Sequence, residues 1–174
     1  LTKRVNILEG VCITGGEPTL NKNLPDFICR IKDLGFKVKL DTNGSNPSML
    51  RYLVAENFLD YVAMDIKNSL HKYGTTVGIL NFNTDKVEES ADFLMSNIVP
   101  YEFRTTVVKE LHEADDFIQI GLWLKGAKSY YIQNYKDSGD TISPGLTSCT
   151  KEELMHYKLL LAPYIESVEL RGID

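Results

Sequence analysis

Five short apolar runs in the sequence end in, or are followed by, glycines or polar side chains. The five groups are Gly15, Gly16 and Glu17; Asp41 and Asn43; Asp65 and Lys67; Arg104 and Thr106; and Gln133 and Asn134. The set combines carboxylates with an ammonium and a guanidinium, which suits a zwitterionic ligand better than a polyphosphate. Because ligands bind at the carboxyl ends of parallel strands, we predict that these groups form one binding site.

Several of these residues have a chemical role toward such a ligand. Glu17 and neighbouring backbone carbonyls can hold an ammonium, and Lys67 or Arg104 can hold a carboxylate, through charge-assisted hydrogen bonds. Asp41 and Asn43 can bind ribose hydroxyls. The glycines at 15 and 16 have no Cβ, so a ligand can approach the backbone closely and a positive φ costs little.

Structural roles are the alternative for the same residues. A Gly-Gly pair after a strand is often only a turn, and Asp65 and Lys67 lie two residues apart, where they can form an ion pair. Arg104, Gln133 and Asn134 can cap the ends of a barrel. The recurrence of such groups on five successive strands favours the binding interpretation.

The remaining reactive side chains form no recognisable catalytic set. His71, His112 and His156 lack metal-ligand spacing, and we expect them in loops or on solvated helix faces. The Tyr130-Tyr131 pair and Trp123 are expected to pack in the core. The sequence contains no Ser-His-Asp arrangement and no Walker-type loop.

Composition bounds the class of protein. The chain has 174 residues, 43% of them hydrophobic, and a net charge of −5 without a basic block, which argues against a nucleic-acid partner. Its apolar runs are far shorter than the roughly 20 residues that cross a bilayer, so we expect no membrane association. Cys12, Cys29 and Cys149 are separated by 17 and 120 positions, which fits no disulfide or zinc framework. Reduced thiols and a cytoplasmic location are expected.

Hydrophobic periodicity predicts strictly alternating strands and helices. The expected strands span 11–14, 37–40, 61–66, 102–108, 129–133 and 168–171; the expected helices span 24–34, 47–56, 84–96 and 114–125, and a last helix opens with a capping box from Thr150 to Glu153 and fades near Pro163. In the first helix, Leu24, Phe27, Ile28 and Ile31 share the face expected to be buried. Such alternation implies a parallel sheet with outer helices, either doubly wound or a (β/α) barrel.

Five motifs in this order resemble the radical S-adenosylmethionine enzymes. They are Val11-Cys-Ile-Thr-Gly-Gly-Glu-Pro18, Leu40-Asp-Thr-Asn-Gly44, Ala63-Met-Asp-Ile-Lys67, Phe103-Arg-Thr-Thr-Val107 and Tyr130-Tyr-Ile-Gln133. The chain is most similar to activating enzymes of glycyl radical proteins, of the pyruvate formate-lyase and especially the anaerobic ribonucleoside-triphosphate reductase type.

This resemblance implies a fold, a reaction and partners. The fold is a partial (β/α)6 barrel, and a 4Fe-4S cluster cleaves S-adenosylmethionine reductively to give a 5′-deoxyadenosyl radical. That radical takes a hydrogen from a glycine of the partner, a glycyl radical enzyme such as the anaerobic ribonucleotide reductase. A reductant such as flavodoxin or ferredoxin supplies the electron.

The resemblance also carries roles over to single residues. Gly15, Gly16 and Glu17 would hold the methionine ammonium, Asp41 and Asn43 the ribose, and Lys67 or Arg104 the carboxylate. Asp41 and Asp65 together would bind a monovalent cation, and Gln133 and Asn134 would face the cofactor.

One departure from the family is large. Its members bind the cluster through Cys-x3-Cys-x2-Cys after the first strand, and these 174 residues contain no such motif. Cys12, Cys29 and Cys149 are expected in a strand, in a helix and before the last helix, where they cannot replace it. We therefore expect a single radical S-adenosylmethionine domain over 1–174 that lacks its first βα unit and its metal ligands and is inactive alone.

Three other functions stay open for this chain. The chain could belong to a radical S-adenosylmethionine enzyme that acts on a small molecule, such as a deazaguanine-forming synthase. It could be an aldolase-like barrel in which Lys67 forms a Schiff base, or a non-catalytic binding domain.

If the first βα unit is missing, the strand at 11–14 has a free edge, and association through that edge is expected.

Overall fold

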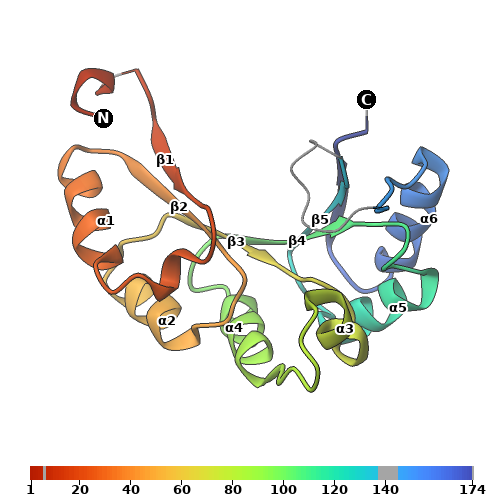
Figure 1. Ribbon diagram of the computed structural model, residues 1–174. Helices are drawn as coiled ribbons and strands as arrows, with labels where there is room; N and C mark the ends of the chain where they lie inside the picture. Colours follow the sequence, from red (N-terminus) through yellow and green to blue (C-terminus); the bar gives the residue numbers. More distant parts are fainter. Residues whose placement is uncertain (6, 137–144, 174) are drawn as a thin grey trace. The chain divides into compact units, whose positions relative to one another are not determined.

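The computed structural model describes residues 1–5, 7–136 and 145–173 and shows a parallel α/β fold (Figure 1). The strands are β1 (Gly10–Ile13), β2 (Lys37–Thr42), β3 (Tyr61–Asp65), β4 (Tyr101–Val107), β5 (Ser129–Asn134) and β6 (Ser167–Arg171). The helices are α1 (Leu24–Asp33), α2 (Pro47–Ala55), α3 (Tyr73–Val77), α4 (Asp85–Met95), α5 (Ala114–Trp123) and α6 (Lys151–Leu161). The strands follow one another in the sheet in chain order, which confirms the expected fold class.

The chain divides into two compact units. Unit 1 comprises 1–65 and 85–101 and contains β1 to β3 with α1, α2 and α4; unit 2 comprises 66–84 and 102–174 and contains β4 to β6 with α3, α5 and α6. Within each unit the paired strands described are parallel, so their carboxyl ends lie at one edge.

Alternation along the strands builds the core of unit 1. In β2, Val38 and Leu40 are fully buried whereas Lys39 and Asp41 are half-buried, because successive side chains point to opposite faces of the sheet. The buried face packs against apolar side chains of the helices, among them Ile28, Leu50 and Leu94.

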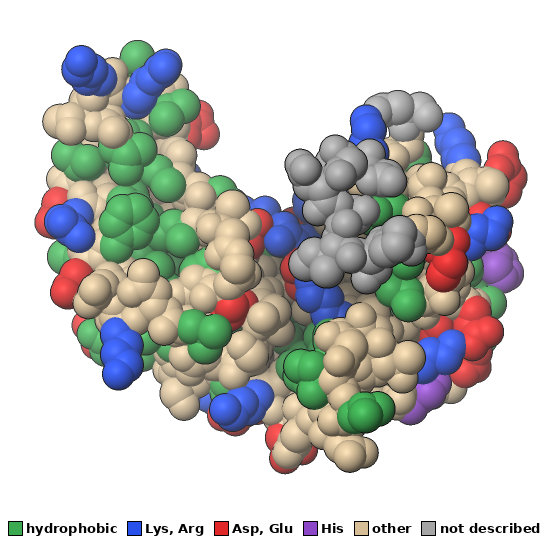
Figure 2. All heavy atoms as spheres, viewed as in Figure 1, with side chains coloured by type: hydrophobic (Ala, Val, Ile, Leu, Met, Phe, Trp, Pro, Cys, Tyr) green, Lys and Arg blue, Asp and Glu red, His purple; other side chains and the backbone are tan. Residues whose placement is uncertain are grey.

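The stripe predicted for α1 is wrong at one position. Leu24, Ile28 and Ile31 are buried, but Phe27 is 46% exposed. Phe27 lies with Gly15 and Arg30 along a hollow beside β1. In Figure 2 hydrophobic side chains gather over the N-terminal segment and α1 of unit 1, where Ile7, Leu8 and Phe27 are exposed.

Unit 2 repeats the pattern around an aromatic core. Phe103, Phe117 and Tyr130 are fully buried, and the rings of Phe117 and Tyr157 stack at 4.3 Å between α5 and α6. The predicted capping box of α6 is present, since Thr150 Oγ accepts from the Glu153 amide and the Glu153 carboxylate accepts from the Thr150 amide. Trp123 is half-buried rather than central.

A short helical segment between β3 and α4 was not predicted. It consists of the 3₁₀ turn Leu70–Lys72 and α3, a helix too short to show an apolar stripe. Among residues 1–5, 7–136 and 145–173, no helix combines the length and apolar character needed to cross a membrane.

Candidate functional site

In unit 1 the loops after β1 and β2 are joined through the side chain of Glu17. Its Oε1 accepts hydrogen bonds from the Thr19 amide at 3.1 Å, the Thr19 hydroxyl at 2.6 Å and the Thr42 hydroxyl at 2.8 Å. Its Oε2 accepts the Asn43 amide at 2.6 Å. The carboxylate is thus fixed between two loops at the carboxyl edge of the sheet.

A second bridge joins the same loops. The Asn46 side-chain amide donates to the Thr19 carbonyl at 2.8 Å, while Asn46 Oδ1 caps α2 by accepting from the Met49 amide at 3.2 Å. Asn43 Oδ1 accepts the Ser45 amide at 2.9 Å, which holds the Asn43 side chain in an Asx turn.

The Gly-Gly turn needs glycine for its backbone, not for packing. Gly15 and Gly16 have φ of 94° and 54°, and a Cβ built on either would meet no atom within 4 Å. Together with Thr14 and Glu17 the first of them borders a hollow of about 490 Å³. The turn therefore exposes its backbone to open space.

The other predicted residues of unit 1 lie on the neighbouring strands. The Asp41 carboxylate lies close to the Lys39 ammonium, with 3.9 Å between Asp41 Oδ1 and Lys39 Nζ. The side chain of Asp41 is 12% exposed. Asp65 is the last residue of β3 and is half-buried. Unit 1 thus brings Glu17 and Asn43 into contact and places Asp41 and Asp65 at the ends of adjacent strands.

Lys67 lies in unit 2, where a buried histidine fixes its backbone. His112 Nδ1 accepts the Val108 amide at 3.1 Å, so the ring proton lies on Nε2, which donates to the Lys67 carbonyl at 2.9 Å. His112 lies in the loop between β4 and α5, as one of the two expected placements had it, and is only 5% exposed. His71 and His156 are exposed as expected.

Three further predicted residues lie on β4 and β5 of unit 2. Arg104 is a half-buried residue of β4. Gln133 Nε2 donates to Thr106 Oγ1 at 3.3 Å, whereas Asn134, on the opposite face, exchanges two 3.0 Å hydrogen bonds with the backbone of Cys149. The amide of Asn134 therefore holds the segment before α6.

Sequence reasoning missed an ion pair on the Gln133 face of unit 2. The Arg171 guanidinium binds both oxygens of Glu102, at 2.9 and 3.0 Å, and lies 3.3 Å from the centroid of the Tyr131 ring. Hydrogen bonds to Glu102 raise the pKa of Arg171 above its ordinary value. Opposite charges on two predicted strands are the only sequence signal for this pair.

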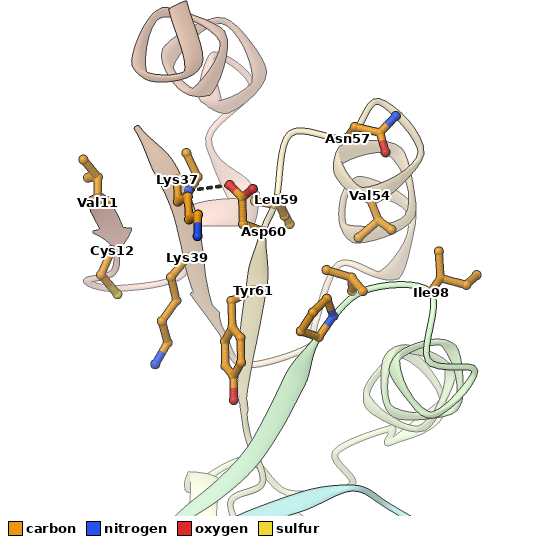
Figure 3. Close-up of a pocket in the computed structure, with 14 residues that line it drawn as sticks. Val11, Cys12, Lys37, Lys39, Val54, Asn57, Leu59, Asp60, Tyr61 and Ile98 are labelled. Carbon is orange, nitrogen blue, oxygen red and sulfur yellow. Dashed lines mark hydrogen bonds between the residues drawn. The ribbon is translucent and has the colours of Figure 1, made fainter. Parts of the chain in front are cut away.

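A larger hollow of unit 1 lies at the other edge of its strands (Figure 3). It encloses about 780 Å³ beside the amino ends of β2 and β3, with Lys37, Lys39 and Tyr61 among its lining residues. Loops at the carboxyl ends carry the polar groups of parallel α/β proteins, so we place the candidate site at the Gly-Gly edge in spite of the smaller hollow there.

Comparisons with known proteins identify the family. No family model matches the chain. A predicted glycyl-radical enzyme activating enzyme of Methanocaldococcus jannaschii is 33% identical over 172 residues, which cover 95% of this chain and 72% of that protein. The chain belongs to the radical S-adenosylmethionine superfamily.

A further relative matches part of the chain, and solved structures share its fold. A probable GTP 3′,8-cyclase of Thermococcus kodakarensis is 30% identical over 62% of this chain and 35% of that protein. A domain of a pyruvate-formate lyase-activating enzyme from Bacteroides vulgatus shares the fold with a TM-score of 0.75 at 14% identity, over 95% of this chain and all of that domain. A radical S-adenosylmethionine methyltransferase from Sphaerobacter thermophilus has the same TM-score, over 94% of this chain and 51% of that protein.

The superfamily implies two bound groups, S-adenosylmethionine and a 4Fe-4S cluster, and the residues present fit only the first. The open glycine backbone and the carboxylates at the ends of β2 and β3 suit a zwitterionic nucleoside such as S-adenosylmethionine. They do not fit a 4Fe-4S cluster: Cys12 lies in β1, Cys29 in α1 and Cys149 before α6, and the described residues contain no group of three His, Cys, Asp or Glu side chains suited to a metal.

Proposed function

We propose that this chain forms the S-adenosylmethionine-binding part of an activating enzyme for a glycyl radical protein, of the anaerobic ribonucleotide reductase type. The observation that carries the proposal is the 33% identity, over nearly the whole chain, to a predicted activating enzyme. The Glu17 network supports it, because it organises the Gly-Gly turn and the loop after β2 in one unit.

Each residue then has a role toward the cofactor. Gly15, Gly16 and Glu17 hold the ammonium, and Asp41 and Asn43 bind the ribose. Asp41 and Asp65 also bind a monovalent cation beside the cofactor. Lys67 and Arg104, which the resemblance assigns to the carboxylate, lie in unit 2 with Gln133, and in the same unit Asn134 bonds to the backbone of Cys149.

The iron site lies outside these residues in this proposal. The 174 residues contain no Cys-x3-Cys-x2-Cys motif that could bind the cluster, and a flavodoxin or ferredoxin is the proposed electron donor. Bound together, the cluster and S-adenosylmethionine provide the 5′-deoxyadenosyl radical that is characteristic of the superfamily. The residues of this chain bind and orient the nucleoside.

Titration of the chain with S-adenosylmethionine tests the binding role directly. We expect NMR shifts at the amides of Gly15, Gly16 and Asn43, with weak affinity because the iron that would hold the amino and carboxylate groups is not supplied by this chain. Shifts confined to other regions, or none at millimolar ligand, would contradict the proposal. With cluster-bearing protein, reductant and candidate partner, anaerobic electron paramagnetic resonance should then detect a glycyl radical.

A small-molecule enzyme is the second candidate. The similarity to the GTP 3′,8-cyclase of Thermococcus kodakarensis favours it, although only 62% of this chain is matched. The same anaerobic reaction distinguishes the two: formation of 5′-deoxyadenosine that depends on a purine nucleotide, with no protein radical, would support the small-molecule function.

A further inference from the structure

The hydrogen bonds of Glu17 leave its carboxylate little capacity for a ligand. A carboxylate offers about four lone-pair positions, and four donors from Thr19, Thr42 and Asn43 occupy the two oxygens of Glu17. Three of them converge on Oε1, and the fourth, the Asn43 amide, reaches Oε2 at 2.6 Å. An ammonium that bound Glu17 without displacing these donors would have only the second lone pair of Oε2, beside the Asn43 amide.

The groups that Glu17 holds belong to the loop after β2. Thr42 is 4% exposed, and its hydroxyl both donates to Glu17 and accepts the Gly44 amide at 3.1 Å. Asn43 is fixed through its own amide by Glu17 and through its side chain by Ser45. Glu17 thereby sets the backbone position of the residue to which the proposed function gives the ribose.

The far side of this loop is held as well. The Gly44 carbonyl accepts the Ser90 hydroxyl at 2.8 Å. Gly44 has φ of 76°, and a Cβ at this position would collide with the Met64 methyl. Ser90 and Met64 therefore fix the loop from the core, and Glu17 fixes it from the Gly-Gly side. Removing Glu17 releases one side of a loop that is otherwise anchored.

We propose that Glu17 is a positioning residue, which acts on the cofactor through Thr42 and Asn43 instead of contacting the methionine ammonium. This inference rests on the proposed function and changes one role within it. The ammonium is left to the backbone of the Gly-Gly turn, and the Glu17 carboxylate serves the nucleoside end of the ligand.

Two ligands separate an indirect role from a direct one. Methylthioadenosine contains the adenine and the ribose but has no ammonium group. S-adenosylhomocysteine contains the adenine, the ribose and the ammonium group. In the Glu17→Gln variant we expect the dissociation constants of both ligands, measured by NMR titration, to rise by the same factor of about ten. Weaker binding of S-adenosylhomocysteine with unchanged binding of methylthioadenosine would overturn the inference.

Variants at Thr42 test the route of the effect. Thr42→Val removes the hydroxyl and should weaken the binding of both ligands, whereas Thr42→Ser, which keeps a hydroxyl, should bind them as the parent does. The loss of affinity in the double variant Glu17→Gln, Thr42→Val should be smaller than the sum of the two single losses, because the residues form one network. Additive effects, or no rescue by serine, would contradict a shared route. Glu56→Gln, which neutralises an exposed carboxylate after α2, should leave both affinities unchanged.

Amide exchange gives a readout that needs no ligand. The Asn43 amide should exchange about tenfold faster in Glu17→Gln than in the parent, while amides in the middle of β2 keep their protection. Unaltered exchange at Asn43 would overturn the inference even if both ligands bind. Failure of the parent chain to bind either ligand would instead contradict the proposed function, and with it the cofactor half of this inference.

Discussion

Asp116 shows how one buried carboxylate can organise two loops of unit 2. It is fully buried and accepts hydrogen bonds from the Ser69 hydroxyl at 2.9 Å, the Lys72 ammonium at 3.1 Å and the Glu113 amide at 2.9 Å. The last of these closes the capping box of α5, and the first two tie the segment after Lys67 to the same helix. A buried charge is tolerated when its partners surround it in this way.

Truncation of Asp116 should therefore be costly. We expect Asp116→Ala to lower the free energy of unfolding by about 2 to 4 kcal/mol, because it removes a helix cap and several hydrogen bonds to a charged group. Urea denaturation followed by circular dichroism measures the change. Asp115→Ala, one residue earlier and exposed, is the matched control and should change stability by less than about 0.5 kcal/mol. Equal losses in the two variants would contradict this role.

At the scale of elements, Asp60 joins β2 to the start of β3. Asp60 Oδ2 accepts the Val38 amide at 2.7 Å and the Lys32 ammonium at 2.8 Å, and the Asp60 amide donates to the Val38 carbonyl. Burial acts to raise the pKa of Asp60, but these hydrogen bonds and the charges of Lys32 and Lys37 outweigh it and lower the pKa below 3.8.

This lowered pKa predicts a pH-dependent contribution to stability. A carboxyl whose pKa is lower in the folded state stabilises the fold above its unfolded value of about 3.9, and the contribution disappears as the pH falls through the folded value. The thermal midpoint of Asp60→Asn should thus be lower than that of the parent at pH 7. The difference between the two midpoints should shrink below pH 4. Asp33→Asn, at an exposed position of α1, serves as control. A difference in midpoint that does not shrink as the pH falls below 4 would contradict the assignment.

The elements themselves were accessible from the sequence because their signals are local. The strand and helix bounds agree with the predictions to within one or two residues at most ends, since period-two and period-3.6 patterns require only neighbouring residues. The exposure of Phe27 was not accessible, because a helical stripe does not reveal whether another element covers it. The short α3 had too few residues to show a period.

Long-range contacts explain what the site prediction missed. The Gly-Gly-Glu motif drew attention to Glu17, but the hydroxyl and amide that it binds lie 25 and 26 residues later. His112 lies in a loop, one of its two expected places, but its burial depends on the Lys67 carbonyl, which is 45 residues away in the sequence. Glu102 and Arg171 are 69 residues apart, and only the strand order brings them together.

At the scale of the whole molecule, the two end strands of the sheet differ in their protection. β6 carries Glu169 and Arg171, whereas β1 consists of Gly10, Val11, Cys12 and Ile13 and has no charged side chain. Charges on an edge strand discourage pairing with another chain. Exposed hydrophobic side chains near β1, among them Ile7 at 67% and Phe27 at 46%, add an apolar surface to that edge.

Association of these 174 residues should therefore proceed through β1. We expect multi-angle light scattering over a dilution series to show a dimer or larger species that dissociates at low concentration. Val11→Lys should shift the series toward monomer, because it places a charge on the uncharged edge. Ser167→Lys introduces the same charge at an exposed position of β6 and should leave the association unchanged. A parent protein that is monomeric at every concentration, or equal responses to the two lysines, would show that the β1 edge does not pair.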